Sequence, residues 1–178
     1  PVQWVNRPNL DFRGFSGLIA SGRVAPGDDI RVVPSGKNAK VRSIVTMASD
    51  GAMQTLDEAV AGQSVTLTLD TQIDCSRGDI IAAADNPPAV ADRFEATLIW
   101  MDETPLLPGR SYEMKIGTQS VAASVQTPKY QVNVNTMEHL ASKTLELNAI
   151  GVVEIATTQK ISFAPYAENR ALGSFVLI

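Results

Sequence analysis

The chain has few residues of the kinds that redox and nucleophilic chemistry use most often. Its 178 residues include one cysteine, Cys75, and one histidine, His139. A single cysteine cannot form a disulfide within the chain, and it leaves a zinc site without its usual thiolates. A triad or metal cluster would need further partners for His139. We therefore interpret His139 as a surface or loop residue and Cys75 as a small, partly buried hydrophobe.

Long apolar runs and long blocks of like charge are also lacking. No apolar stretch approaches the roughly 20 residues that a membrane-spanning helix needs. Residues Pro1 to Leu10 lack the basic start and apolar centre of a signal peptide. The formal net charge of −4 is spread along the chain, which argues against a nucleic-acid binder because such proteins concentrate Lys and Arg. We expect a cytoplasmic protein without nucleic-acid or membrane partners.

Short alternating strands between glycine turns dominate the first half of the chain. The stretch Phe12 to Ile44 carries glycines at its corners, where a side chain would restrict the backbone. Its apolar residues lie two apart, and Ser64 to Asp70 alternates strictly. An apolar run from Ile80 to Ala84 completes the pattern. We expect a barrel of hairpins in which one strand face carries Ile30 and Val32, and another carries Ala39, Val41, Ser43 and Val45.

The second half is again of strand type. Two prolines and several polar residues predict a linker at Asp85 to Arg93. Strands are expected at Phe94 to Met101, Tyr112 to Ile116, Tyr130 to Asn135, Val152 to Thr157 and Ser174 to Ile178. Residues Met137 to Leu147 carry a weak helical pattern, which we interpret as a loop or a single turn. The predicted fold class is all-β.

Three other strings have ordinary structural interpretations. Arg77-Gly78-Asp79 is expected to form a tight turn into the next strand rather than an adhesion motif. Asp102 and Glu103 are adjacent, so on a strand they would point to opposite faces and could not flank one glycosidic bond. The stretch Ala48 to Ala59 is expected to be a solvated loop.

Several strings resemble one family over essentially the whole chain. They are Pro1 to Gly17, Ile73 to Asp79, Tyr130 to Asn135, Leu145 to Val153 and Tyr166 to Arg170. On these strings the chain resembles the large GTP-binding subunit of bacterial sulfate adenylyltransferase. The resemblance implies two small β-barrels like the second and third domains of translation-factor GTPases, at residues 1–88 and 89–178, the second without its closing strand.

The resemblance also implies a function for the whole protein. In this family a small catalytic subunit makes adenosine 5′-phosphosulfate from ATP and sulfate, and GTP hydrolysis in the large subunit drives that step. The barrels are expected to couple the two reactions. The implied partners are the protein's own amino-terminal GTPase domain, the small catalytic subunit and an adenylylsulfate kinase.

The nucleotide-binding motifs of this family are missing from the chain. Gly22 and Gly27 have the spacing of a phosphate loop, but Asp28 and Asp29 stand where lysine and a hydroxyl residue are required. The guanine-reading Asn-Lys-x-Asp motif is missing too. We therefore expect no catalytic residue, cofactor or metal in this chain, and GTP with Mg in a GTPase domain that the chain lacks.

Inter-domain or partner contacts are the remaining candidate sites. The candidates combine charge or amide groups with backbone corners, since an arginine fork suits a buried contact between domains. They are Asn6, Arg7, Arg13, Arg23, Asn169 and Arg170. The competing interpretation is that these residues solvate loops or, for Asn169 and Arg170, cap a strand corner.

Two other function classes stay open at this stage. One is a translation elongation factor whose barrels hold aminoacyl-tRNA, against which the acidic charge and the sulfurylase-like strings count. The other is a stand-alone β-barrel binding module, for which the missing closing strand is awkward.

Overall fold

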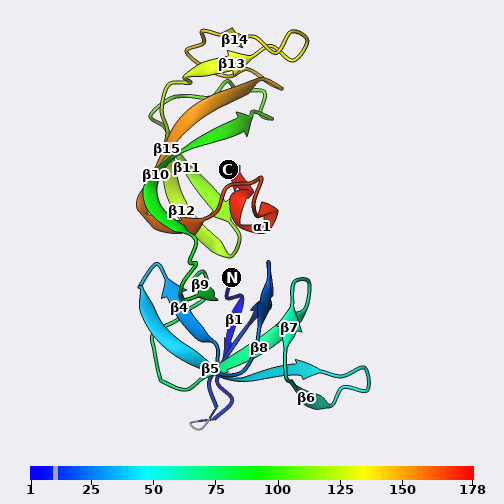
Figure 1. Ribbon diagram of the computed structural model, residues 1–178. Helices are drawn as coiled ribbons and strands as arrows, with labels where there is room; N and C mark the ends of the chain where they lie inside the picture. Colours follow the sequence, from blue (N-terminus) through cyan, green and yellow to red (C-terminus); the bar gives the residue numbers. More distant parts are fainter. Residues whose placement is uncertain (10–11) are drawn as a thin grey trace. The chain divides into compact units, whose positions relative to one another are not determined.

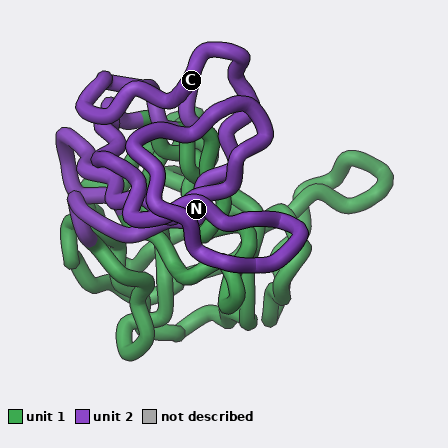
Figure 2. Tube along the Cα trace, turned by 90° about the horizontal axis from the view of Figure 1, so that it is seen from above, with its two compact units in different colours: residues 1–90, 115–120, 162–176 green, residues 91–114, 121–161, 177–178 purple. Residues whose placement is uncertain are grey.

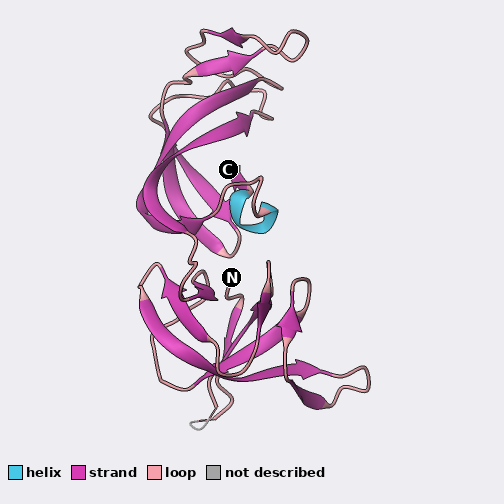
Figure 3. Ribbon diagram, viewed as in Figure 1, coloured by secondary structure: helices cyan, strands magenta, loops and turns pink. Residues whose placement is uncertain are grey.

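The computed structural model describes residues 1–9 and 12–178. Residues 10 and 11, within the amino-terminal string that carries the resemblance, lie outside the described residues. The described part is built almost entirely of β-strands, with one short helix, α1 (Arg170–Gly173). Figures 1 and 3 show the strands as broad twisted arrows. The all-β prediction is confirmed.

The first sheet is formed by residues from the amino-terminal half. Its strands lie in the order β1 (Trp4–Asn6), β2 (Gly14–Leu18), β8 (Ser64–Leu69), β5 (Lys37–Met47), β4 (Asp29–Val33) and β9 (Ile80–Ala83), and β6 (Met53–Leu56) pairs with β5. A separate two-stranded sheet joins β3 (Arg23–Val24) to β7 (Ala59–Val60). The neighbouring strands β1–β2, β2–β8, β8–β5, β5–β4 and β4–β9 all run antiparallel.

Strand β5 departs from the predicted alternation. Its pairing with β8 shifts register between Val41 and Ser43, which marks a β-bulge. A bulge adds one residue to one strand and so moves the following side chains to the opposite face. Ile44 is therefore fully buried, while Ser43 and Val45 are only half-buried. The prediction that Ser43 and Val45 continue the buried face of Ala39 and Val41 was wrong.

The stretch Ala48 to Ala59 is more ordered than a solvated loop. Strand β6 pairs with β5 from Ile44 opposite Leu56 to Met47 opposite Met53, and β7 begins at Ala59. Figures 1 and 2 show this β5–β6 hairpin projecting from the body of its unit. Most residues of β6 are exposed, so burial leaves no alternating pattern there, and the loop interpretation missed the strand.

The second sheet is formed by the carboxy-terminal half. Its strands lie in the order β14 (His139–Leu140), β13 (Tyr130–Val132), β15 (Ile150–Phe163), β12 (Gln119–Val125), β11 (Ser111–Ile116) and β16 (Phe175–Leu177), and β10 (Ala89–Ile99) pairs with β15. Strand β11 alternates between buried and exposed residues as predicted.

Several predicted boundaries in this half need correction. Strand β10 begins at Ala89, inside the predicted linker, because the chain can pair as soon as Pro87 and Pro88 are passed. Strand β15 is longer than Val152 to Thr157, and β12 was not predicted. Strand β13 ends at Val132, so Val134 lies outside it. The stretch Met137 to Leu147 forms no helix, in agreement with the loop interpretation.

Two compact units divide the chain (Figure 2). Unit 1 comprises residues 1–90, 115–120 and 162–176, and unit 2 comprises residues 91–114, 121–161 and 177–178. Unit 1 thus contains the whole first sheet together with the turn between β11 and β12 and the segment around α1. The domain boundary between residues 88 and 89 stays a prediction.

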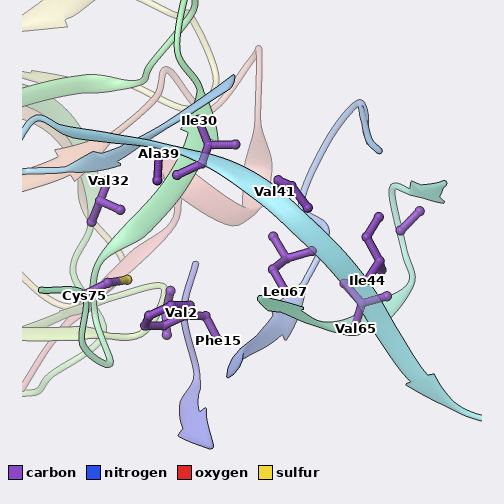
Figure 4. Packing of buried hydrophobic residues seen from close by; sticks show 11 residues of the cluster. Val2, Phe15, Ile30, Val32, Ala39, Val41, Ile44, Val65, Leu67 and Cys75 are labelled. Carbon is purple, nitrogen blue, oxygen red and sulfur yellow. The ribbon is translucent and has the colours of Figure 1, made fainter. Parts of the chain in front are cut away.

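The core of unit 1 is aliphatic. Figure 4 shows its side chains gathered along the bent strand β5. The buried cluster consists of Val2, Phe15, Ile30, Val32, Ala39, Val41, Ile44, Ala59, Val65, Leu67 and Cys75. A second, smaller cluster in unit 1 joins Val33 and Ile80 to Leu172, with Ala82, Val90 and Ala164 packed against it. Residues 162–176 therefore pack on β4 and β9.

Two buried aromatic rings of unit 2 contact each other. Trp100 and Tyr112 meet edge to face, with ring centroids 5.7 Å apart and an interplanar angle of 77°. The indole Nε1 of Trp100 donates to the carbonyl of Thr104 at 2.7 Å, and the Tyr112 hydroxyl accepts from the Leu107 backbone N–H at 3.1 Å. The polar atoms of both buried rings are thus satisfied by the loop that follows β10, as buried aromatics require.

Candidate functional site

The amino-terminal candidates lie near the start of the first sheet. Asn6 is half-buried at the end of β1, opposite Gly14 of β2. A Cβ on Gly14 would lie 2.4 Å from Thr66 Cγ2, so only glycine permits this close approach of β2 and β8. Arg7 follows β1 and is exposed. The structure thus places Asn6 in the sheet and leaves Arg7 facing solvent.

Arg13 is the most enclosed arginine of the amino-terminal candidates. It is half-buried, and its guanidinium carbon lies 5.3 Å from the centroid of the Phe15 ring, within the range of a cation–π contact. Its charge also reaches Asp74. The Lys37 ammonium, 2.7 Å from that carboxylate, holds the pKa of Asp74 below its ordinary value, and Arg13 adds a smaller effect in the same direction. Arg13 therefore already has contacts within unit 1.

Arg23 has a carboxylate partner within unit 1. It lies on β3, and its Nη1 donates to Oε2 of Glu58 at 2.8 Å, next to β7. Both side chains are exposed, so the pair contributes little to stability. Its effect is to link the two ends of the short β3–β7 sheet.

Asn169 and Arg170 belong to a helical turn rather than to a strand corner. Asn169 is the N-cap of α1, and its Oδ1 accepts from the Leu172 backbone N–H at 3.2 Å. The guanidinium carbon of Arg170 lies 5.7 Å from the Tyr166 ring centroid. Gly173 is needed behind this turn, because a Cβ there would lie 2.5 Å from the Tyr166 Cα. The capping interpretation is correct for Asn169, but the capped element is a helix.

A groove of about 1210 Å³ lies in unit 1, to which all the residues that line it belong. The β2–β3 connection, β9 and residues of the segment 164–172 line it. Its floor reaches the core residues Phe15, Val65 and Leu67. The groove brings together two of the six candidates, Arg23 and Asn169.

The charges along this groove are mostly negative. Asp28, Asp29, Asp85 and Glu168 line it, against the single cation Arg23. Asp29 is paired with Lys40 at 2.7 Å, and Asp28 accepts from the Ala25 backbone N–H at 2.8 Å. Sequence reasoning missed Asp85 and Glu168, which lie far apart in the chain. The proline pair at 87–88 directly after β9 was the only local signal, and it was interpreted as a linker.

The Arg77-Gly78-Asp79 string forms the predicted tight turn. Gly78 has φ +103°, and Asp79 Oδ2 accepts from the Ser76 backbone N–H at 2.7 Å. Arg77 donates from Nη1 to the Gln3 carbonyl at 2.8 Å. All three residues therefore serve the corner between Cys75 and β9.

Cys75 lies in the core of unit 1 and is only 1% exposed. Burial raises the pKa of its thiol to about 12, and the nearby Asp79 carboxylate acts in the same direction. A thiol must lose its proton to act as a nucleophile or metal ligand, so this environment suppresses both roles. The interpretation of Cys75 as a packed hydrophobe is supported, and its burial is more complete than expected.

His139 is exposed on β14 in unit 2. Its ring stacks on Tyr130 of the neighbouring strand, with centroids 3.8 Å apart and an interplanar angle of 15°. Asp102 and Glu103 lie in a bend after β10 rather than on a strand, and Asp102 Oδ1 accepts from the Thr104 backbone N–H at 2.7 Å. These residues have structural partners close by in the sequence or sheet.

Among residues 1–9 and 12–178, no group of three or more His, Cys, Asp or Glu side chains is placed to hold a metal ion. In that same part of the chain, no helix has the length and apolar character needed to cross a bilayer.

Solved structures with the same architecture define the class of fold. The structure of sup35 complexed with GDP superposes with a TM-score of 0.82, covering 99% of this chain and 43% of that one at 18% identity. The apo form of translation elongation factor SelB from Methanococcus maripaludis gives a TM-score of 0.70 at 22% identity, covering 92% of this chain and 36% of that one. Residues 93–178 match the family described as GTP-eEF1A C-terminal domain-like. The chain has the β-domain fold of translation-factor-type GTPases.

Curated relatives identify the family within that class. A bifunctional enzyme CysN/CysC of Xylella fastidiosa is 51% identical over all 178 residues, which span 28% of its length. Sulfate adenylyltransferase subunit 1 of Alteromonas mediterranea is 47% identical over all 178 residues, which span 37% of its length. The chain belongs to the sulfate adenylyltransferase subunit 1 family and corresponds to a part of that subunit.

Proposed function

We propose that this chain is the accessory β-barrel portion of the GTPase subunit of a sulfate adenylyltransferase. In this role it couples GTP hydrolysis to the formation of adenosine 5′-phosphosulfate from ATP and sulfate. The observation that carries the proposal is the 47% identity to sulfate adenylyltransferase subunit 1 over every residue of the chain. Likeness to sup35 and SelB at 18% and 22% identity supports the fold alone, so it gives no weight to the tRNA-binding alternative.

The proposal assigns nucleotide chemistry to a part of the protein outside this chain. GTP and Mg would bind in a GTPase domain that precedes the barrels, since Asp28 and Asp29 replace the lysine and hydroxyl of a phosphate loop. The partners would be that domain, the small catalytic subunit and, where a bifunctional relative is concerned, an adenylylsulfate kinase. The setting for these ATP-dependent reactions would be the cytoplasm.

The coupling would work through rigid repositioning of the barrels. A nucleotide can shift such a two-state arrangement only by contacts that differ between the states. Asn6, Arg7, Arg13, Arg23, Asn169 and Arg170 are our candidates for those contacts. Arg13 is the strongest of them, because its half-buried guanidinium lies close to the Phe15 ring and within electrostatic reach of Asp74.

An Arg13→Ala variant of the full subunit, assembled with the catalytic subunit, tests the proposal. Removing a guanidinium from a desolvated contact costs about 1 to 3 kcal/mol, and about 1.4 kcal/mol is a tenfold change in an equilibrium. We expect GTP hydrolysis to continue while the product formed per GTP falls. The measurement is the ratio of adenosine 5′-phosphosulfate to phosphate released.

Arg42→Ala is the matched control, because Arg42 is an exposed arginine of the same unit and is not one of the six candidates. Unchanged stoichiometry in Arg13→Ala would assign Arg13 to the stability of unit 1 alone. A wild-type enzyme whose product formation does not depend on GTP would refute the proposed function itself.

A further inference from the structure

Strand β9 ends the first sheet with an edge that is open within the described residues. It pairs with β4, from Val33 opposite Ile80 to Ile30 opposite Ala83, and it lies at the end of the strand order. Just beyond this ladder the Ala84 N–H donates to the Asp29 carbonyl at 3.1 Å. Backbone groups alternate in direction along an antiparallel strand. The N–H and C=O groups of Ile81 and Ala83 therefore point away from β4, and of these four groups the Ala83 carbonyl already accepts from the Asn86 N–H at 3.2 Å.

The chain at Val2 already pairs with the residues just before this edge. The Val2 N–H donates to the Asp79 carbonyl at 2.8 Å, and the Gly78 N–H donates to the Val2 carbonyl at 3.1 Å. Gly78 and Asp79 thus both lie opposite Val2, and Gly78 has φ +103°. This is the pattern of a glycine-containing bulge between antiparallel strands. Going backward along the chain from Val2 therefore means going forward along β9.

The groove of unit 1 occupies the space along that edge. Pro1 and β9 both line it, together with the core residues Phe15 and Leu67. Gly17 fixes the direction of approach, because a Cβ there would lie 2.3 Å from the Pro1 carbonyl oxygen and would push the chain off β2. An extended segment that continues the Val2 pairing would enter this groove.

We propose that the polypeptide preceding Pro1 in the full subunit adds an antiparallel strand to β9 and fills the groove. Its backbone would bond to the outward N–H and C=O of Ile81 and to the Ala83 N–H, which is strand addition to an open sheet edge. The mainly acidic lining, which includes Asp85 and Glu168, suits a strand that carries Lys or Arg. The inference rests on the proposed function, in which a GTPase domain precedes these barrels.

Such a strand would join two parts of the subunit mechanically. It would be a member of the unit 1 sheet and also the covalent continuation of the GTPase domain. On one face of β9, the side chains of Ile80 and Ala82 pack in the same cluster as Leu172 of α1. A displacement of the GTPase domain would therefore be transmitted through β9 to the α1 segment without any bound nucleotide near the barrels.

Amide hydrogen exchange of the full subunit tests the proposal directly. If the strand is present, the amides of Ile81 and Ala83 should exchange at least about a hundredfold more slowly than in an unstructured peptide, as paired sheet amides do. The amide of Ala82, which faces β4, is the internal reference. Exchange at Ile81 and Ala83 within about tenfold of the unstructured rate, with Ala82 protected, would overturn the proposal.

A proline substitution in the same protein gives a second readout. Ala83→Pro removes an N–H that points away from β4, so the β4 ladder keeps its donors while the added strand loses one. We expect the Ile81 amide to exchange at least about tenfold faster in Ala83→Pro than in Ala83→Ser, which keeps the N–H. Equal exchange in the two variants would contradict strand addition. Protected amides in a subunit whose GTPase does not drive product formation would refute the proposed function and leave this inference standing.

Discussion

The two compact units enclose their cores in different ways. In unit 2 the loop after β10 supplies backbone partners for both buried aromatic rings, through Thr104 to Trp100 and through Leu107 to Tyr112. In unit 1 the sheet ends at β9, and a groove reaches the core beside Phe15. Alternating strands thus build both cores, whereas the loops decide which buried polar atoms are satisfied and where a groove reaches the core.

The largest expected effect lies in the sealed core of unit 2. Trp100→Ala should lower the free energy of unfolding by about 3 to 5 kcal/mol, because it leaves a cavity and removes the partner of the Thr104 carbonyl. The adjacent Met101, which is 80% exposed, provides the control, and Met101→Ala should change stability by less than about 0.5 kcal/mol. Urea unfolding measures both. Similar losses in the two variants would contradict the enclosure of Trp100.

The β5 bulge in unit 1 predicts the next largest effect. Ile44→Ala should lower the free energy of unfolding by about 2 to 5 kcal/mol, since the Ile44 side chain is fully buried. Val45→Ala should cost clearly less, because Val45 is half-buried. The same denaturant titration distinguishes the two registers. If Val45→Ala proved the more damaging change, the bulge between Val41 and Ser43 would be in the wrong place.

The buried thiol of unit 1 predicts a stability change at alkaline pH. The pKa of Cys75 is about 12 in the folded chain, against 9.0 for an ordinary thiol. A pKa raised by folding contributes stability that is complete below pH 9 and is lost as the pH rises towards 12. Wild type should therefore lose stability above pH 9 more steeply than Cys75→Ala.

Alkylation of this thiol gives an independent check. Iodoacetamide at pH 8 should react slowly with the folded chain and rapidly with the chain in urea, because the reactive thiolate forms only after exposure. Equal alkylation rates in the two states would show that the core around Cys75 is open, as the groove side of unit 1 is.

The smallest expected effect concerns an exposed carboxylate of unit 1. Asp70 Oδ1 accepts from the Lys40 backbone N–H at 2.9 Å and from the Thr71 hydroxyl at 2.8 Å, and these bonds lower its pKa. A lowered pKa gives stability that is present at neutral pH and is lost as the pH falls through the folded pKa. Asp70→Asn should therefore be slightly less stable than wild type at pH 7 and equal to it in strong acid. A difference that persists in strong acid would point to a cause other than charge.

The sequence predicted strands best where one face is buried and one is exposed. Strands β8 and β11 follow strict alternation, and both lie where the pattern places them. Strand β12 was missed because its residues are mostly small, so the contrast between its faces is weak. The bulge in β5 was invisible because Ser43, Ile44 and Val45 fit either register by composition.

The candidate contact residues show a different limit. The sequence could suggest Asn169 as a capping residue, because asparagine side chains bond to nearby backbone N–H groups. It could not show that Asn169 and Arg23, which are far apart in the chain, line the same groove. Nor could it show that Arg23 is already paired with Glu58. Contacts between distant segments depend on how the strands pair and pack in the folded chain.

By itself, the sequence determined the fold class, the absence of nucleotide-binding motifs in this chain and the family to which the chain belongs. These follow from local alternation, from turn residues and from matching strings, all of which can be read from residues that are neighbours in the sequence. The tertiary structure decided the register of β5, the burial of Cys75 and the open edge of β9 beside the groove. Each of these depends on which segment packs against which, because hydrogen-bonded partners and buried surfaces are shared between residues that the sequence keeps apart.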